Sequence, residues 1–122
     1  MRDLRKKLLG KRGEDLAAQF LQKNGYKILE RNFAKRYAEI DIVAQEKDVL
    51  VFVEVKTRTS SDFGNPLEAI TFWKLKALTR SCQFYKSLHP ELPEALRIDA
   101  VSVLLSPSGE VAKIELVKNI SV

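Results

Sequence analysis

Cysteine, histidine, proline and glycine are all scarce in this sequence. Its 122 residues include one Cys, one His, four Pro and five Gly. A single cysteine excludes an intrachain disulfide and, by itself, a zinc site built from thiolates. So little glycine and proline also excludes a collagen-like or low-complexity chain. We therefore expect a protein that folds around an ordinary hydrophobic core, with Cys82 as a small buried residue in it.

A long apolar run is also missing. No stretch of the sequence is apolar over the length that crosses a bilayer. The start of the chain, MRDLRKKLLGKRGED, carries charges where a signal peptide has its apolar segment. The composition, 45% hydrophobic and 30% charged, is typical of globular proteins. We expect a cytoplasmic protein that folds as one domain over residues 1–122 and does not associate with membranes.

Acidic residues are outnumbered by basic ones. The chain has 21 Lys and Arg residues against 16 Asp and Glu residues, which gives a formal net charge of +5. The basic excess lies at the start of the chain and again between Lys74 and Lys86. This balance suits a polyanion such as nucleic acid. A solvated cationic surface has the same balance, so charge alone leaves both interpretations open.

The spacing of apolar residues predicts a first helix. Leucine, alanine and phenylalanine recur at helical intervals from Leu8 and stop before an Asn-Gly pair, a common end of helices. The predicted helix therefore covers about residues 8–24. Gly10 and Gly13 weaken its first turn, because glycine has a low helix propensity.

A second helix is predicted after a loop-like stretch. Asn65, Pro66 and Glu68 place a capping residue, a first-turn proline and an acid at the spacing of a helix start. Phe72 then opens an apolar stripe, which a proline-containing segment interrupts after about Leu88. We expect this helix to begin near the capping residues and to end near Leu88.

Five segments have the alternation or β-branched composition of strands. They are residues 26–33, 37–44, 49–57, 96–105 and 111–118. In the second segment, alternation places Ile40 and Ile42 on one face and Glu39 and Asp41 on the other. A polar turn joins the second and third segments into an antiparallel hairpin. The order of elements predicts an α/β or α+β fold, with one mixed sheet flanked by helices.

Three ionisable residues converge on the predicted hairpin. Asp41 and Glu54 lie on neighbouring strands, and Lys56 shares the face of Glu54 because it follows two residues later. Adjacent carboxylates in apolar strands favour a hard divalent metal ion such as Mg²⁺ or Mn²⁺. Lys56 would orient or deprotonate a water, or offset charge on a phosphate. The ordinary alternative is a cross-strand ion pair of Glu54 and Lys56 on a solvated face, with Asp41 solvated.

These motifs resemble a nuclease superfamily. An Asp on one strand and E-x-K on the next, after a helix that carries an acid, resemble the PD-(D/E)XK nucleases, which include restriction enzymes and Holliday-junction resolvases. Within that superfamily the chain resembles the YraN-like family over almost its whole length, through GKRGEDLAAQFLQKNGYKILERNF, YAEIDIVA, LVFVEVKTR, FGNPLEAIT and RIDAVSV. Ala38 replaces a glycine that is usual in the family, and Ile40 replaces the superfamily's proline. The resemblance implies a restriction-endonuclease-like fold.

The resemblance also implies roles for individual residues. Asp41 and Glu54 match the metal-binding acids, and Lys56 matches the catalytic lysine. Glu14 matches a helical acid that reaches the same metal ion, and Glu39 is the family's other hairpin acid. From the residues alone, a surface acid is the favoured interpretation of Glu14, whereas Glu39 either aids the metal ion or pairs with a lysine. The implied activity is Mg²⁺- or Mn²⁺-dependent hydrolysis of DNA that leaves a 5′ phosphate, with branched DNA as the nearest analogy.

Basic and aromatic residues near the motifs are candidates for nucleic-acid contacts. The candidates for phosphate binding are Arg58, Lys74, Lys11 and Arg12. Arg97 either contacts a phosphate or holds an acid such as Asp99. Four aromatic residues are either core residues or surfaces on which unpaired bases stack; they are Phe72, Trp73, Phe84 and Tyr85.

Three functions stay open on the sequence. A metal-dependent DNA endonuclease is favoured, and the alternatives are a non-catalytic nucleic-acid-binding module of the same fold and an RNA-directed nuclease. No Ser-His-Asp arrangement, Walker-type loop or Rossmann fingerprint indicates another class of enzyme. A homodimer would bring two sites to paired strands, as in resolvases, and a protein partner would supply substrate choice. The sequence alone does not decide whether the protein forms a homodimer or needs a protein partner.

Overall fold

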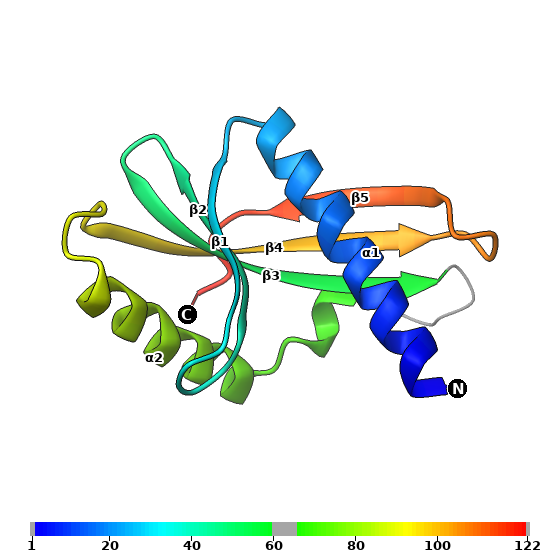
Figure 1. Ribbon diagram of the computed structural model, residues 1–122, viewed down its shortest axis with the longest axis horizontal. Helices are drawn as coiled ribbons and strands as arrows, with labels where there is room; N and C mark the ends of the chain where they lie inside the picture. The colour runs from blue at the N-terminus through cyan, green and yellow to red at the C-terminus, as the bar shows by residue number, and fades with distance from the viewer. Residues whose placement is uncertain (1, 60–65, 122) are drawn as a thin grey trace.

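The chain forms a five-stranded mixed sheet with one helix on each face (Figure 1). A computed structural model describes residues 2–59 and 66–121. The elements are α1 (Arg2–Lys23), β1 (Lys27–Phe33), β2 (Ile40–Glu46), β3 (Val49–Thr59), a 3₁₀ helix η1 (Pro66–Ala69), α2 (Phe72–Leu88), β4 (Ala95–Leu105) and β5 (Val111–Val117). The predicted α+β class, with a mixed sheet between helices, is confirmed. None of the described helices is long and apolar enough to cross a membrane.

The strands pair in chain order from β1 to β5. All neighbours are antiparallel except β3 and β4, which are parallel and are connected through α2 on one face of the sheet. The register of β3 with β4 continues to Thr59, whereas its register with β2 ends at the pair of Ile42 and Val53. Residues 54–59 therefore form a stretch of β3 that extends past its backbone pairing with β2. We call this stretch the β3 edge.

Two hydrophobic cores lie on opposite faces of the sheet, because β3 carries apolar residues at every position from Val49 to Val53. The core under α1 consists of Ala17, Ala18, Leu21, Tyr26, Ile42, Ala44, Val51, Val53, Val101, Val103 and Leu105. The core under α2 consists of Phe33, Ile40, Val43, Leu50, Phe52, Leu78, Cys82, Tyr85 and Ile98. Cys82 is buried, as predicted, and burial raises the pKa of its thiol to about 12.

Helix α1 begins at Arg2, earlier than the predicted residue 8. Its glycines lie inside the helix, and the packing of Gly13 explains why a residue of low propensity is tolerated there. A Cβ atom on Gly13 would overlap the hydroxyl of Thr57 and lie 2.8 Å from its Cβ and Cγ2 atoms. Gly13 thus sets how closely α1 approaches β3. The predicted end of the helix is confirmed, and Gly25 follows it with a positive φ of 88°.

Helix α2 begins later than predicted. Thr71 caps it by accepting a hydrogen bond from the Lys74 N–H at 3.1 Å, while residues 66–69 form the separate helix η1. The expected capping residue, Asn65, lies outside the described residues. Phe72 was expected in the buried stripe and is instead 53% exposed, because the part of α2 that packs on the sheet starts at Leu75. The predicted end at Leu88 is confirmed.

The predicted alternation in β2 is wrong at its first residues. Ile42 lies in the core under α1, but Ile40 lies with Val43 in the core under α2. The pairing of β2 with β3 ends at Ile42, and the Asp41 carboxylate accepts the Val55 N–H at 2.8 Å. A side chain replaces the backbone partner at this point, so the strict period of a paired strand no longer applies.

A buried polar network lies at the opposite end of β2. Arg97 donates to both Asp99 carboxylate oxygens, at 2.8 and 2.9 Å, and to Glu46 at 2.7 Å. Asp99 is 0% exposed and also accepts from the Tyr26 hydroxyl at 2.8 Å and the Asn119 N–H at 2.9 Å. Of the two roles left open for Arg97, the structure supports the one of holding Asp99.

Replacing Arg97 with Met should lower the free energy of unfolding by about 3 to 5 kcal/mol, because it leaves the Asp99 carboxylate buried without its cation. Urea denaturation measures this change. Lys113→Met, which removes a surface ion pair with Glu115, should leave the stability unchanged and serves as the control. Equal midpoints for the two variants would show that Asp99 is stable without Arg97.

Gly13→Ala should lower the free energy of unfolding by about 1 to 3 kcal/mol, because the new methyl group collides with Thr57. Gly10→Ala is the matched control, since a Cβ atom there meets nothing within 4 Å. That variant should gain about 0.5 to 1 kcal/mol from helix propensity alone. Thermal unfolding of both variants tests the close approach, and shifts in the same direction would argue against it.

Candidate metal and nucleic-acid site

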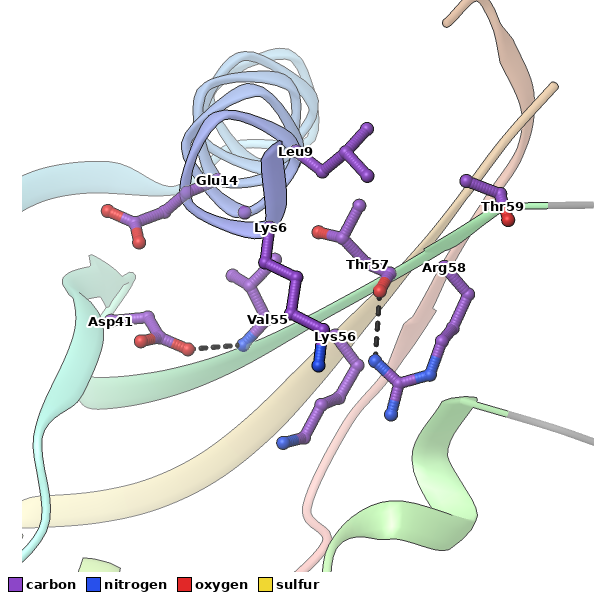
Figure 2. A pocket seen from close by; sticks show the side chains of 10 residues that line it. Lys6, Leu9, Glu14, Asp41, Val55, Lys56, Thr57, Arg58 and Thr59 are labelled. Atoms are coloured by element: carbon purple, nitrogen blue, oxygen red, sulfur yellow. Dashed lines mark hydrogen bonds between the residues drawn. The ribbon is translucent and has the colours of Figure 1, made fainter. Parts of the chain in front are cut away.

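A cavity of about 650 Å³ lies along the β3 edge. Its walls come from α1, β2 and β3; the lining residues are Lys6, Leu9, Gly10, Glu14, Asp41, Val55, Lys56, Thr57, Arg58 and Thr59. Figure 2 shows Lys6 and Glu14 projecting from α1, with Asp41 across from them on β2. The cavity exists because β2 ends its pairing while β3 continues along β4.

Asp41 lies at the start of β2, half-buried on the wall of the cavity. Its Oδ2 atom accepts the Val55 N–H at 2.8 Å, which fixes the direction of the carboxyl group. Burial, and then the neighbouring charge of Glu54, raise the pKa of Asp41 to about 8. A nearby cation would reverse this effect, because it stabilises the ionised form.

Glu54 is the most buried member of the predicted triad, with 4% of its surface exposed. Its Oε2 atom lies 3.7 Å from the Lys56 ammonium and 3.7 Å from the Lys74 ammonium. The ordinary alternative, an ion pair on a solvated face, does not describe a carboxylate buried to this degree. The structure thus brings together three predicted residues, Asp41, Glu54 and Lys56, and adds Lys74 from the first turn of α2.

Glu14 and Glu39 lie near the triad but are held by other partners. Arg31 donates to Glu14 from Nε at 3.2 Å and from Nη2 at 3.1 Å. The side-chain amide of Asn32 donates to Glu14 at 3.1 Å and to Glu39 at 2.9 Å, so it links the two acids. Glu14 lines the cavity and its charge adds to the raised pKa of Asp41, whereas Glu39 is exposed.

Asn32 and Lys6 are site residues that the sequence did not single out. Asn32 has a positive φ of 56° and lies between the β1–β2 pairs of Arg31 and Phe33, directly across from Asp41. The residue type was the available signal, because asparagine tolerates the left-handed region better than most residues. For Lys6 the signal was its spacing of eight residues from Glu14, which places both on one helix face.

The predicted phosphate-binding residues fall into two groups. Arg58 lines the cavity and donates to the Thr57 carbonyl at 2.9 Å, and Lys74 pairs with Glu54. Lys11 and Arg12 instead lie on the outer face of α1, where Arg12 donates to the Gly109 carbonyl at 2.7 Å. The close packing of α1 on β3 at Gly13 turns these two basic residues away from the cavity.

The Asp41–Glu54 pair suits a hard divalent cation. Among residues 2–59 and 66–121, no three His, Cys, Asp or Glu side chains are grouped closely enough to hold a metal ion by themselves. Mg²⁺ does not require such a group, since it often binds one or two carboxylates and keeps several waters. The buried Glu54 and the half-buried Asp41, whose pKa is raised to about 8, offer neighbouring carboxylate oxygens of the kind that this ion binds.

The chain is similar to several proteins of one family. Residues 13–103, which include Glu14 and the triad, match the model of Uncharacterised protein family UPF0102. A UPF0102 protein of Dictyoglomus turgidum is 41% identical over 113 residues, which are 93% of this chain and 96% of that protein. A UPF0102 protein of Syntrophomonas wolfei is 50% identical over 97 residues, 80% of this chain and 84% of that protein. A third, from Caldicellulosiruptor saccharolyticus, is 43% identical over 116 residues, 95% and 98% of the two chains. The chain therefore belongs to the UPF0102 family, the YraN-like family that its motifs resemble.

Proposed function

We propose that this protein is a metal-dependent nuclease that hydrolyses phosphodiester bonds of DNA at the β3 edge. The observation that carries the proposal is the pair of the half-buried Asp41 and the buried Glu54, with the Lys56 ammonium 3.7 Å from Glu54. The cavity beside this pair also contains Lys6 and Arg58. Asp41 thus lines the same cavity as cations for phosphates and has Glu54 beside it, an arrangement that suits metal-dependent phosphodiester hydrolysis.

Each residue of the triad has a task in this proposal. Asp41 and Glu54 would hold Mg²⁺ or Mn²⁺, with Glu14 as a further candidate ligand once it leaves Arg31. When bound, the ion would polarise a phosphoryl oxygen and lower the pKa of a water. The Lys56 ammonium, 24% exposed beside Glu54, would orient the attacking water or offset the charge that develops on the phosphate.

The basic residues of the cavity would guide the substrate. Lys6 on α1 and Arg58 on β3 line the same cavity as Lys56 (Figure 2), so they can contact phosphates near the scissile bond. Branched DNA is proposed as the substrate through the resemblance to resolvases, with a 5′ phosphate on the product. RNA is the alternative substrate, and the same assay distinguishes the two.

A second candidate function is a nucleic-acid-binding module that does not cleave. Glu54 already has two lysine partners in the structure, and Glu14 is held by Arg31 at 3.1 Å. These contacts favour a site in which lysines, rather than a metal ion, neutralise the acids. Such a module would bind nucleic acid through its basic residues, and its affinity would fall with salt as in the enzyme.

Metal ions should stabilise the parent protein through Asp41. Saturating Mg²⁺ or Mn²⁺ is expected to add about 1 to 3 kcal/mol to the free energy of unfolding, by binding only the folded state. Asp41→Asn should raise the stability without metal, because it removes one of two adjacent acids that repel each other, and should abolish the response to metal. Thermal unfolding with and without chelator measures both effects.

Asp48→Asn is the matched control for this experiment, because Asp48 is an exposed acid in the turn between β2 and β3. It should respond to metal as the parent does. A metal response that survives in Asp41→Asn would contradict the assignment of Asp41 as a ligand. No response in any of the proteins would favour the module in which lysines neutralise the acids.

Cleavage assays distinguish the enzyme from the binding module. Labelled four-way junctions, flaps, duplexes, single strands and RNA would be incubated with Mg²⁺, Mn²⁺ or chelator. The parent should cut at least one DNA substrate with metal, and Lys56→Met should lower the rate by about 10²- to 10⁴-fold while binding is kept. Lys113→Met, remote from the cavity, should cut like the parent. Binding without cleavage by any of these proteins would establish the binding module instead.

A further inference from the structure

Two aromatic side chains at the start of α2 are exposed to solvent. Phe72 is 53% exposed and Trp73 is 73% exposed, although both belong to residue types that normally bury most of their surface. Their rings meet edge to face, with centroids 5.4 Å apart. The Lys76 ammonium lies 5.7 Å from the Phe72 centroid and 5.6 Å from the Trp73 centroid, so a cation accompanies the pair.

A third exposed aromatic residue, also accompanied by cations, lies in a loop beside the same helix. Tyr37, in the β1–β2 loop, is 54% exposed, and the guanidinium carbons of Arg36 and Arg80 lie 5.2 and 6.0 Å from its ring centroid. The Ser81 hydroxyl holds this loop against α2 by contacts of 3.0 Å with the Arg36 carbonyl and 2.6 Å with the Ala38 carbonyl. Figure 1 shows the β1–β2 loop beside the first half of α2.

These residues form one continuous surface. Trp73, Lys76 and Arg80 follow each other at intervals of three and four residues, so they lie on one side of α2. We refer to these six residues as the aromatic ridge: Phe72, Trp73, Lys76, Arg80, Arg36 and Tyr37. It extends about 10 Å along the helix from Trp73 to Arg80, at a rise of about 1.5 Å per residue. Lys74, next to Trp73 in the chain, reaches Glu54 and connects the ridge to the candidate site.

We propose that the aromatic ridge binds unpaired bases of a nucleic-acid strand beside the β3 edge. Bases stack on aromatic rings without regard to sequence, and the interleaved Lys and Arg side chains can contact the phosphates between them. The placement beside a cleavage site rests on the proposed function, but the binding of unpaired bases does not. The preferred substrate then contains single-stranded DNA, as in a flap or an opened junction.

Charge favours a nucleic acid over a protein on this surface. Residues 72–88 include Lys74, Lys76, Arg80 and Lys86 but no Asp or Glu. A second copy of the chain docked through this ridge would bring like charges together, which opposes a symmetric dimer. Of the other two aromatic candidates, Tyr85 lies in the core under α2 and Phe84 packs against that core. Phe72 and Trp73 are therefore the two of the four that remain available for stacking.

Trp73 is the chain's single tryptophan and reports directly on its own environment. We would titrate the intact protein in chelator, so that no strand is cut, with a single-stranded thymidine oligonucleotide. An oligonucleotide of equal length and charge that lacks bases is the matched ligand. The expected result is quenching of tryptophan fluorescence by the thymidine strand, with binding at least several-fold tighter than for the abasic strand. Equal quenching and equal affinity for both would overturn the proposal.

Variants separate stacking from charge. By anisotropy of a labelled strand, Trp73→Ala should weaken binding about tenfold or more, and Trp73→Phe should keep most of the affinity. Leu8→Ala, which trims an exposed apolar residue of α1 on the other face of the sheet, should bind like the parent. Lys76→Ala should reduce the number of counterions released on binding by about one, measured as the slope of the logarithm of the binding constant against the logarithm of the salt concentration. Unchanged binding by Trp73→Ala would overturn the proposal. Sedimentation gives a second test, because a parent protein that is a dimer and a Trp73→Ala variant that is a monomer would show that the ridge is a dimer interface instead.

The outcome is independent of catalysis. If the ridge binds single strands but the protein cuts no substrate with metal, the proposed binding of unpaired bases is supported and the proposed nuclease function is contradicted. If the parent cuts DNA and Trp73→Ala cuts and binds single-stranded substrates equally well, the nuclease function is supported and the proposed role of the ridge is contradicted.

Discussion

The hydrogen bond from the Val55 N–H to the Asp41 carboxylate joins β2 to β3 at the point where their backbone pairing ends. A side chain that accepts a strand N–H lets β2 turn away without leaving that donor buried and unpaired. The cavity along the β3 edge exists because of this divergence. The same bond holds Asp41 beside Glu54, where partial burial and the neighbouring carboxylate make its ionised form unfavourable. Strand geometry and site electrostatics therefore depend on one interaction.

Acids in the interior of this sheet are held in two different ways. On β4, Asp99 is matched by a guanidinium, a hydroxyl and a backbone amide, each within 2.9 Å. Where β2 and β3 diverge, Asp41 and Glu54 adjoin each other, and two ammonium groups lie 3.7 Å from Glu54. The first arrangement satisfies its carboxylate at short range and serves stability. The second holds its acids through longer ion pairs and raises the pKa of Asp41, and carboxyl groups perturbed in this way are frequent at functional sites.

Patterns with a local cause were predictable from the sequence. The strands and the pairing of Glu54 with Lys56 follow from a period of two residues, and the helix ends follow from an Asn-Gly pair and a proline-containing segment. Features that depend on distant contacts were not predictable. Gly13 weakens a helix locally, and only its contact with Thr57, 44 positions later (57 − 13), explains why it is there. The exposure of Phe72 likewise depends on where the sheet ends beneath α2.

The burial of Cys82 makes the protein convenient for chemical labelling. Its thiol lies in the core under α2 and burial raises its pKa to about 12, so at neutral pH almost no reactive thiolate forms. The chain has no second cysteine that would need to be removed. A cysteine introduced anywhere on the surface would then be the one position that a dye or spin label modifies. Distances between labelled protein and labelled nucleic acid could be measured on an otherwise native sequence.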